Sequence, residues 1–341
     1  MKKKTFILTT ALVVMHIGFI IAGVYSFIFS RPFNIDKSTY IYIDKNDNID
    51  SVFTKIENNL NPKSLSGIKF LSWLKGYENN IRTGAYWIEP GTRAIDAFRM
   101  LNAGNQTPVR LIVPGVRTID RLVGRVSRQI MADSTEIISL LNDSSFISGL
   151  GYTKETLPAL FIPNTYEVYW NMSAESFIKR MKREYEAYWN ETRLAKAKAI
   201  GLTPIEVCTL ASIVEEETAN NGEKPMVAGL YINRLKRGIP LQADPTVKFS
   251  LQDFGLKRIL FKHLEVDSPY NTYKIKGLPP GPIRIPSVIG LNSVLDYTRH
   301  NYIYMCAKED FSGTHNFATN LREHNINARK YQQALNKRNI K

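Results

Sequence analysis

The feature that most constrains the fold is an almost uncharged run near the start of the chain. Lys2, Lys3 and Lys4 precede it, it extends from Thr5 to Ser30, and Arg31 follows. About 26 residues at ~1.5 Å per residue more than span a hydrocarbon core of roughly 30 Å. A cleaved signal peptide would have an apolar region of about 7–15 residues and a small-x-small site, and no clear site follows. The run therefore predicts one transmembrane helix over residues 5–30.

The charges beside this helix predict its orientation. Because positive residues stay on the cytoplasmic side, residues 1–4 form a cytoplasmic tail and everything after Arg31 lies outside the cytoplasm. The formal net charge of +14 favours a polyanionic partner. An extracytoplasmic location argues against nucleic acid, which leaves a membrane surface or an anionic cell-wall polymer.

Length and composition predict two folded units after the membrane helix. The chain has 341 residues, 44% hydrophobic and 22% charged, as in ordinary globular proteins. Residues 31–106 alternate strand and helix patterns and predict a small α+β unit. The polar segment 104–107 is the predicted boundary, and a strand over 109–113 begins a larger α+β unit that extends to residue 341. In this unit we expect a charged helix over 173–200, a helix over 205–218, and loops after Gly238.

The two cysteines leave two interpretations open. In an oxidising compartment Cys208 and Cys306 could form one disulfide. Cys208 lies inside an apolar helical pattern, however, where a free cysteine usually behaves as a small buried hydrophobe. We favour free thiols.

Three consecutive acids follow the apolar part of the helix predicted over 205–218. At ~100° per residue, one apolar stripe forms and Glu217 falls about 40° from its centre, whereas Glu215 and Glu216 fall more than about 100° away. The stripe consists of Val207, Leu210, Ala211, Ile213 and Val214. Glu217 is therefore the acid expected to lie closest to apolar neighbours, and it also lies near the negative end of the helix dipole. Both would raise its pKa into the range useful for proton transfer, although a partly buried structural acid would show the same pattern.

Six segments in order resemble the endolytic murein transglycosylases of the MltG (YceG-like) family. They span residues 211–218, 231–235, 241–247, 268–273, 277–283 and 313–317. Residues 84–86 and 90–92 match the LysM-like region of that family more weakly. Two positions depart from the family pattern: Asn164 stands where an aspartate is expected, and Ser287 stands where a glycine is expected. The first departure puts an essential carboxylate at that position in doubt.

The resemblance implies an α+β protein with a single N-terminal transmembrane helix, a LysM-like domain over 31–106 and a catalytic domain over 107–341. In the family the second acid of a Glu-x-Glu-Thr element is catalytic. In this sequence that position corresponds to Glu217, and the first acid of the element corresponds to Glu215. It also implies a lyase that cleaves the β-1,4 bond between N-acetylmuramic acid and N-acetylglucosamine within peptidoglycan strands, leaving 1,6-anhydromuramoyl ends. Such an enzyme would terminate nascent strands at the bacterial plasma (inner) membrane, beside peptidoglycan synthases as partners.

Further polar residues in these segments are candidate substrate contacts. Asp244 is either a second acid or the cap of an Asp-Pro turn. Arg234 would form a structural ion pair or contact the anionic lactyl-peptide part of muramic acid. His315 would hydrogen-bond in the cleft or serve the structure. Amide and hydroxyl groups that suit N-acetyl groups and sugar hydroxyls come from Asn233, Gln242, Asn271 and Tyr273.

We expect neither a metal nor a cofactor. His300, His315 and His324 are spaced by fifteen and nine residues, which does not match compact ligand motifs. Two other functions stay open. A muramidase, which is a hydrolase, would need a second carboxylate such as Asp244 facing Glu217. A non-catalytic scaffold would bind peptidoglycan through the LysM-like unit and release nothing.

Overall fold

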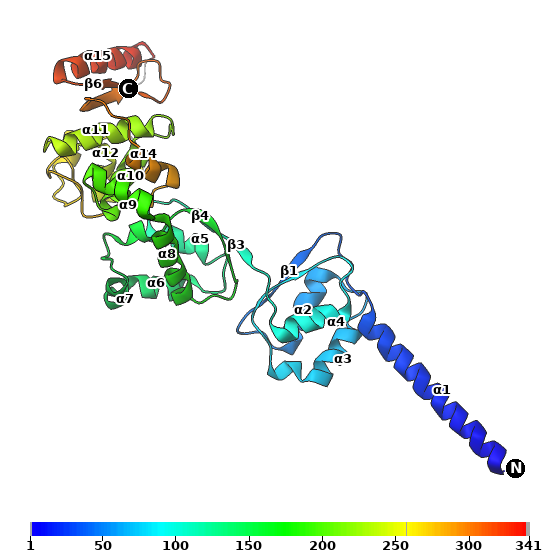
Figure 1. Ribbon diagram of the computed structural model, residues 1–341. Coiled ribbons are helices and arrows are strands. Elements are labelled where there is room, and N and C mark those ends of the chain that lie inside the picture. The colour runs from blue at the N-terminus through cyan, green and yellow to red at the C-terminus, as the bar shows by residue number, and fades with distance from the viewer. Residues whose placement is uncertain (1, 257, 339–341) are drawn as a thin grey trace. The chain divides into compact units, whose positions relative to one another are not determined.

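The computed structural model describes residues 2–256 and 258–338 and has a mixed α+β fold, as predicted (Figure 1). It divides into two compact units. Unit 1 contains the chain up to Leu111 together with Glu167–Met172, and unit 2 contains Ile112–Tyr166 and the chain from Ser173 onward. The chain leaves unit 1 within strand β3 (Val109–Val113) and returns to it within β4 (Asn164–Val168), and these two strands pair with each other. The division thus falls a few residues after the predicted boundary at 104–107.

Helix α1 (Lys2–Phe29) contains the apolar run at the start of the chain. Its segment Thr9–Phe29 is long and apolar enough to cross a membrane, and its most apolar stretch contains no buried residue. A single apolar helix at this position fits a single-pass membrane anchor.

Unit 1 forms its core between a two-stranded sheet and three helices. Strand β1 (Thr39–Ile43) pairs antiparallel with β2 (Gly84–Ile88), so that Thr39 faces Ile88 and Ile43 faces Gly84. Their inward side chains meet α2 (Ile49–Leu60), α3 (Ser66–Lys75), the short 3-10 helix η1 (Tyr77–Asn79) and α4 (Ala94–Ala103). Gly104 ends α4 with φ of 71°, a left-handed conformation that glycine adopts without a steric penalty.

Unit 2 is largely helical. Its small antiparallel hairpin pairs β5 (Tyr304–Ala307) with β6 (His315–Ala318), so that Ala307 faces His315, and the helix α15 (Leu321–Lys337) packs against it. The other elements, in chain order, are α5 (Ile119–Val126), α6 (Ser134–Asn142), α7 (Ser144–Gly149), η2 (Leu157–Leu160), α8 (Ala174–Tyr188), α9 (Glu191–Ile200), α10 (Pro204–Glu217), α11 (Lys224–Lys236), α12 (Asp244–Leu251), α13 (Phe261–Leu264) and α14 (Val288–Leu295).

Helix α10 is the central helix of unit 2. Thr203 caps its first turn by accepting a hydrogen bond from the backbone of Glu206, and Pro204 occupies the first helical position, where no backbone donor is lost. Every residue from Val207 to Val214 is buried, because α9, α11, α12 and α14 pack around it (Figure 1). The predicted single apolar stripe is therefore too narrow, since α10 is buried on all sides.

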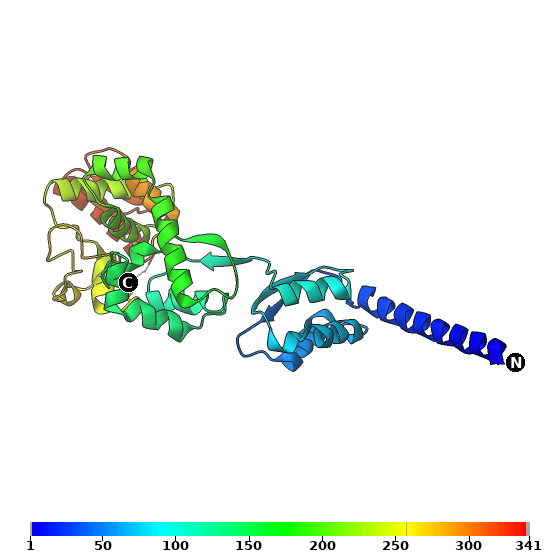
Figure 2. The same ribbon diagram turned by 60° about the horizontal axis from the view of Figure 1, so that its bottom comes forward.

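Two predictions about the larger unit have different outcomes. The single charged helix expected over 173–200 is wrong: it breaks at Trp189, and Asn190 caps a new helix by accepting from the backbone of Arg193. The loop-rich character beyond Gly238 is confirmed, because α12 and α13 are short helices in an otherwise irregular segment. This segment is drawn in yellow and orange and lies to one side of unit 2 in Figure 2.

Candidate active site

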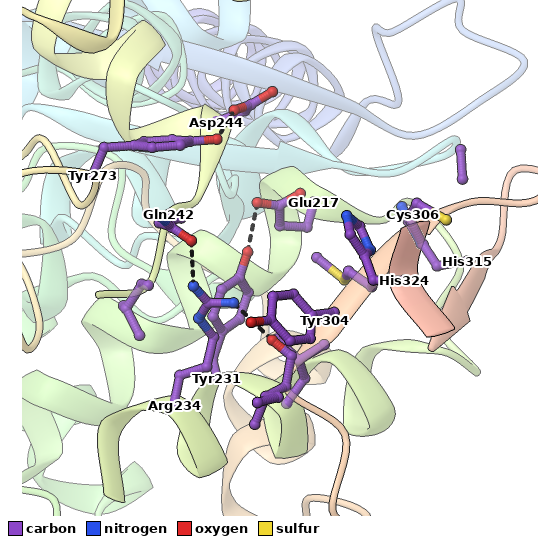
Figure 3. A pocket seen from close by; sticks show the side chains of 15 residues that line it. Glu217, Tyr231, Arg234, Gln242, Asp244, Tyr273, Tyr304, Cys306, His315 and His324 are labelled. Carbon is purple, nitrogen blue, oxygen red and sulfur yellow. Dashed lines mark hydrogen bonds between the residues drawn. The ribbon is translucent and has the colours of Figure 1, made fainter. Parts of the chain in front are cut away.

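A cavity of about 290 Å³ opens in unit 2 between the end of α10, helix α11, the loop before α12 and the β5–β6 hairpin (Figure 3). It brings together segments that lie up to about a hundred residues apart in the chain. Glu217 lies in its wall. The other polar side chains that line it are Tyr231, Arg234, Gln242, Asp244, Tyr273, Tyr304, His315 and His324.

The Glu217 carboxyl group is held by a single buried phenol. The hydroxyl of Tyr231, on α11, donates a hydrogen bond to Glu217 Oε1 at 2.7 Å, and Tyr231 is only 2% exposed. Burial raises the pKa of Glu217 to about 7, the Tyr231 hydrogen bond opposes this increase, and the negative charge of Asp244 adds to it. A carboxyl group with a pKa near neutrality can both give and take a proton at physiological pH.

Asp244 also lines the cavity and is paired with a phenol of its own. Tyr273 donates its hydroxyl proton to Asp244 Oδ1 at 2.6 Å. The backbones that carry both residues are tied together, because Ala243 N donates to Thr272 Oγ1 at 3.0 Å and Gln242 N donates to Thr272 O at 3.0 Å. Asp244 is the first residue of α12, and within the described part of the chain its carboxylate accepts from Tyr273 and from no backbone donor. The turn-capping interpretation of Asp244 is therefore wrong.

Arg234 forms hydrogen bonds to neutral oxygens at the floor of the cavity instead of the predicted ion pair. Its guanidinium donates to the carbonyls of Pro240 at 2.9 Å and Ile303 at 2.7 Å, and to the side-chain oxygen of Gln242 at 2.5 Å. Arg234 is 5% exposed, and burial lowers its pKa. It fixes the loop before α12 and the residue that precedes β5 to α11, and it positions the Gln242 amide at the cavity.

Two histidines line the cavity, His315 from strand β6 and His324 from helix α15. Glu223 accepts from the backbone of His315 at 2.7 Å, and its other oxygen lies 2.9 Å from His315 Nδ1. The ring of His324 stacks on Tyr304, with centroids 5.3 Å apart, and burial together with Arg234 lowers the His324 pKa. His300 contacts the carbonyl of Met226. The three histidines thus have separate partners.

Asn233 and Asn271 were predicted as substrate contacts, but they are not among the described residues that line the cavity. Asn233 donates to the carbonyls of His300 and Tyr302, at 2.7 and 3.0 Å. Asn271 is fully buried and donates to the carbonyls of Leu264 and Val266, both at 2.8 Å. Both amides satisfy backbone acceptors of irregular segments, so these residues shape the loops around the site.

The two acids before Glu217 are fixed in ion-pair networks. Arg117 contacts both oxygens of Glu216, and Arg284 donates to its Oε1 at 2.7 Å. Burial pushes the pKa of Glu216 up, but the two guanidinium groups outweigh it and hold the pKa below its usual range. Glu215 accepts from the backbone and hydroxyl of Ser287, at 3.0 and 2.8 Å. These contacts anchor the last turn of α10 and hence the backbone of Glu217.

We predict that Glu216→Gln destabilises unit 2 by about 2 kcal/mol, because it leaves two guanidinium groups with a neutral partner in a largely buried place. Thermal unfolding of the variant and the native chain measures this loss. Glu175→Gln is the matched control, since Glu175 forms an exposed i,i+4 pair with Lys179 on α8. Equal unfolding temperatures for the two variants would contradict the anchoring role of Glu216.

Comparisons with known proteins decide the family. The model of the YceG-like family matches residues 41–330, which is most of the chain. The chain belongs to the YceG-like family. Relatives named endolytic murein transglycosylase come from Bacillus subtilis, 27% identical over 90% of this chain and 89% of the relative, and from Streptococcus pneumoniae, 26% identical over 86% of this chain and 58% of the relative. A solved YceG-like protein from Listeria monocytogenes shares the fold, with a TM-score of 0.57, 25% identity, and 86% of this chain and 99% of that chain covered.

The two departures from the YceG-like pattern have different structural consequences. Ser287 caps α14 by accepting from the backbone of Gly290 while its hydroxyl donates to Glu215, so the serine adds a contact to the network at the end of α10. Asn164 is exposed at the start of β4 and accepts from the backbone of Thr165. It is not among the described residues that line the cavity.

Sequence reasoning missed four residues of the site. Tyr231 contacts Glu217, Glu223 contacts His315, and Tyr304 contacts Arg234. His324 stacks on Tyr304. Tyr231 lies within one of the YceG-like segments, which was the available signal. The others follow only from the way the hairpin and α15 pack beside α11.

Proposed function

We propose that this protein is an endolytic peptidoglycan lytic transglycosylase and that Glu217 is its catalytic acid and base. The observation that carries the proposal is a single carboxyl group with a pKa of about 7 in the wall of the cavity. Membership of the YceG-like family and the names of the relatives from Bacillus subtilis and Streptococcus pneumoniae support the substrate, a murein strand cleaved internally.

One carboxyl group is sufficient for this reaction. Protonated Glu217 gives its proton to the oxygen of the β-1,4 bond as the N-acetylglucosamine leaving group departs. The resulting carboxylate then takes the proton of the muramoyl 6-hydroxyl as that oxygen attacks the anomeric carbon. The products are a free 4-hydroxyl on one fragment and a 1,6-anhydro ring on the other, and no water is consumed. Because Tyr231 donates to Oε1, we assign the transferred proton to Oε2.

The remaining polar groups of the cavity serve to hold the glycan. Gln242, Tyr273 and His315 offer an amide, a hydroxyl and an imidazole to N-acetyl groups and sugar hydroxyls. Asp244 is committed to Tyr273 through a 2.6 Å hydrogen bond, and its charge raises the pKa of Glu217. Asp244 therefore supports the protonated form of Glu217 and does not act as the base for a water molecule.

The location follows from α1. We infer a single-pass protein of the bacterial plasma membrane with a short cytoplasmic N-terminus, because Lys2–Lys4 precede the span, and with both units outside the cytoplasm. Unit 1 would then be a LysM-like domain, at residues 31–106 in the sequence, that adds glycan contacts. An enzyme at this surface acts on strands close to the peptidoglycan synthases that extend them.

The test is mass spectrometry of fragments released from purified peptidoglycan by the full chain in detergent micelles. We predict 1,6-anhydromuramoyl ends. These are about 18 mass units lighter than the corresponding reducing ends, because the ring closes without the water molecule that hydrolysis adds. Performing the digestion in ¹⁸O-water adds a second readout, because a lyase incorporates no label. Labelled reducing ends would identify a muramidase instead. Binding without any release would support the scaffold function.

A further inference from the structure

Helix α3 of unit 1 carries an apolar stripe that the core of the unit does not cover. Its buried side consists of Gly67, Ile68, Leu71 and Ser72. Trp73 is 76% exposed and Leu74 is 56% exposed, and Phe70 lies one turn before Leu74 with its ring 6.0 Å from that of Trp73. The three residues are spaced i, i+3 and i+4, so they share one side of the helix. Large exposed apolar residues grouped in this way mark an interaction surface.

This stripe lies beside the membrane helix. Gly67 packs against the last turns of α1 so closely that a Cβ atom there would lie 2.3 Å from the carbonyl oxygen of Phe27. Ile28 packs into the core of unit 1 at the same place. Leu74 follows Gly67 by seven residues, which places it within about 20° of the same helical side. Helix α3 thus lies beside the end of α1 (Figure 1), and the apolar stripe begins next to this contact.

The contact with Phe27 also sets the depth of α3. Phe27 lies inside the apolar segment Thr9–Phe29, two residues from its end, which corresponds to about 3 Å along the helix axis. A helix that touches this residue lies at the boundary between acyl chains and headgroups. Aqueous exposure of Trp73 at this level would be unfavourable, because the indole ring prefers that boundary.

The charges on α3 suit the same environment. Lys69 is 52% exposed on one flank of the stripe, where its ammonium lies 3.8 Å from the equally exposed Glu57 carboxylate. Lys75 is exposed at the last turn, where a cation also interacts favourably with the helix dipole. Lysine side chains can extend from an apolar surface toward lipid phosphates. An amphipathic helix with tryptophan and leucine on one side and exposed lysines outside that side is typical of segments that lie in the membrane interface.

We propose that α3 is a second membrane contact, with Phe70, Trp73 and Leu74 inserted among the upper acyl chains of the bilayer and with Lys69 and Lys75 at the lipid phosphates. The occupant of this surface is the phospholipid bilayer, because the stripe begins beside the end of the membrane helix and lies at the depth of that end. Together with α1, α3 fixes the orientation of unit 1 on the membrane surface. The inference rests on α1 as the anchor and does not depend on the chemistry of Glu217.

Tryptophan quenching in reconstituted vesicles tests the proposal. The full chain is inserted into phosphatidylethanolamine–phosphatidylglycerol vesicles, with or without bromine atoms on the upper acyl carbons, and flotation with the vesicles verifies the α1 anchor separately. Emission of the native chain minus that of Trp73→Phe gives the Trp73 contribution. We expect this difference to lose most of its intensity in brominated vesicles and to resist quenching by aqueous iodide.

Two other results would overturn the proposal. Quenching by iodide but not by bromine would place Trp73 in water. Protection of the Trp73 emission from both quenchers would mean that protein covers α3. If this protection increased with the protein-to-lipid ratio, the covering protein would be a second copy of the chain. Trp189→Phe is the matched control, since Trp189 is 5% exposed in unit 2 and its emission should respond to neither quencher.

Discussion

Replacement of Glu217 by glutamine is expected to reduce the cleavage of peptidoglycan strands by about 10³-fold or more. General acid–base catalysis typically contributes about 10²–10⁴-fold, and the proposed reaction uses this one group first as the acid and then as the base. Glutamine keeps the volume of the side chain and can still accept the Tyr231 hydrogen bond through its carbonyl oxygen. The variant should therefore bind glycan as the native chain does while releasing almost none.

Glu186→Gln is the matched control for this loss. Glu186 lies exposed on α8 and pairs only loosely with Lys182, at 3.5 Å. Release of anhydromuramoyl fragments over time, normalised to glycan binding, should be unchanged in the control. Substantial release by Glu217→Gln would mean that another group supplies the proton, and Asp244→Asn would then be the variant to compare.

The sequence was sufficient to find Glu217 because helical phase is a local property. The five apolar residues of the stripe predict which side of the helix faces the interior, and that side includes position 217. The same argument could not predict how deeply α10 is buried, since four other helices supply the remaining contacts. Glu215 and Glu216 were therefore expected on the solvated side, yet both have partners about 70 to 100 positions away in the chain. Glu216 forms ion pairs with Arg117 and Arg284, and Glu215 accepts a hydrogen bond from the backbone of Ser287.

Residue type alone was a weaker guide for the other site residues. Asn271 and Gln242 carry the same amide group in neighbouring motifs, but only Gln242 lines the cavity. The difference arises because Asn271 satisfies carbonyls of an irregular segment, which leaves no pattern in the sequence. Glu223 was missed for a similar reason. Its partner His315 lies in strand β6, far away in the sequence, and only the tertiary fold brings the two side chains together.

A helical pattern of residues also does not determine where the helix ends. The segment 173–200 has a continuous helical pattern of charged and apolar residues, but Asn190 can accept from the backbone three residues later. This cap competes with a hydrogen bond inside a continuous helix and starts α9 in a new direction. The break matters for the site, because α9 and the redirected chain pack against the central helix α10.

The raised pKa of Glu217 predicts a pH-dependent stability that its glutamine variant lacks. The pKa is about 7 in the folded chain against an ordinary value of 4.5, so the unfolded chain loses this proton first as the pH rises. The contribution to stability is fully present below pH 4.5 and is lost as the pH rises through about 7. The difference of about 2.5 pKa units corresponds to about 3 kcal/mol.

The free energy of unfolding of the native chain should therefore fall, relative to that of Glu217→Gln, by about 3 kcal/mol between pH 4 and pH 8. Urea unfolding in detergent micelles, followed by the emission of the buried Trp189, measures this difference for unit 2. Groups that titrate identically in both chains cancel in the comparison, and Glu186→Gln should show no such trend. A difference that stays constant over this range would mean that Glu217 titrates at its ordinary pKa, and the same carboxyl group could not then serve as both acid and base near neutral pH.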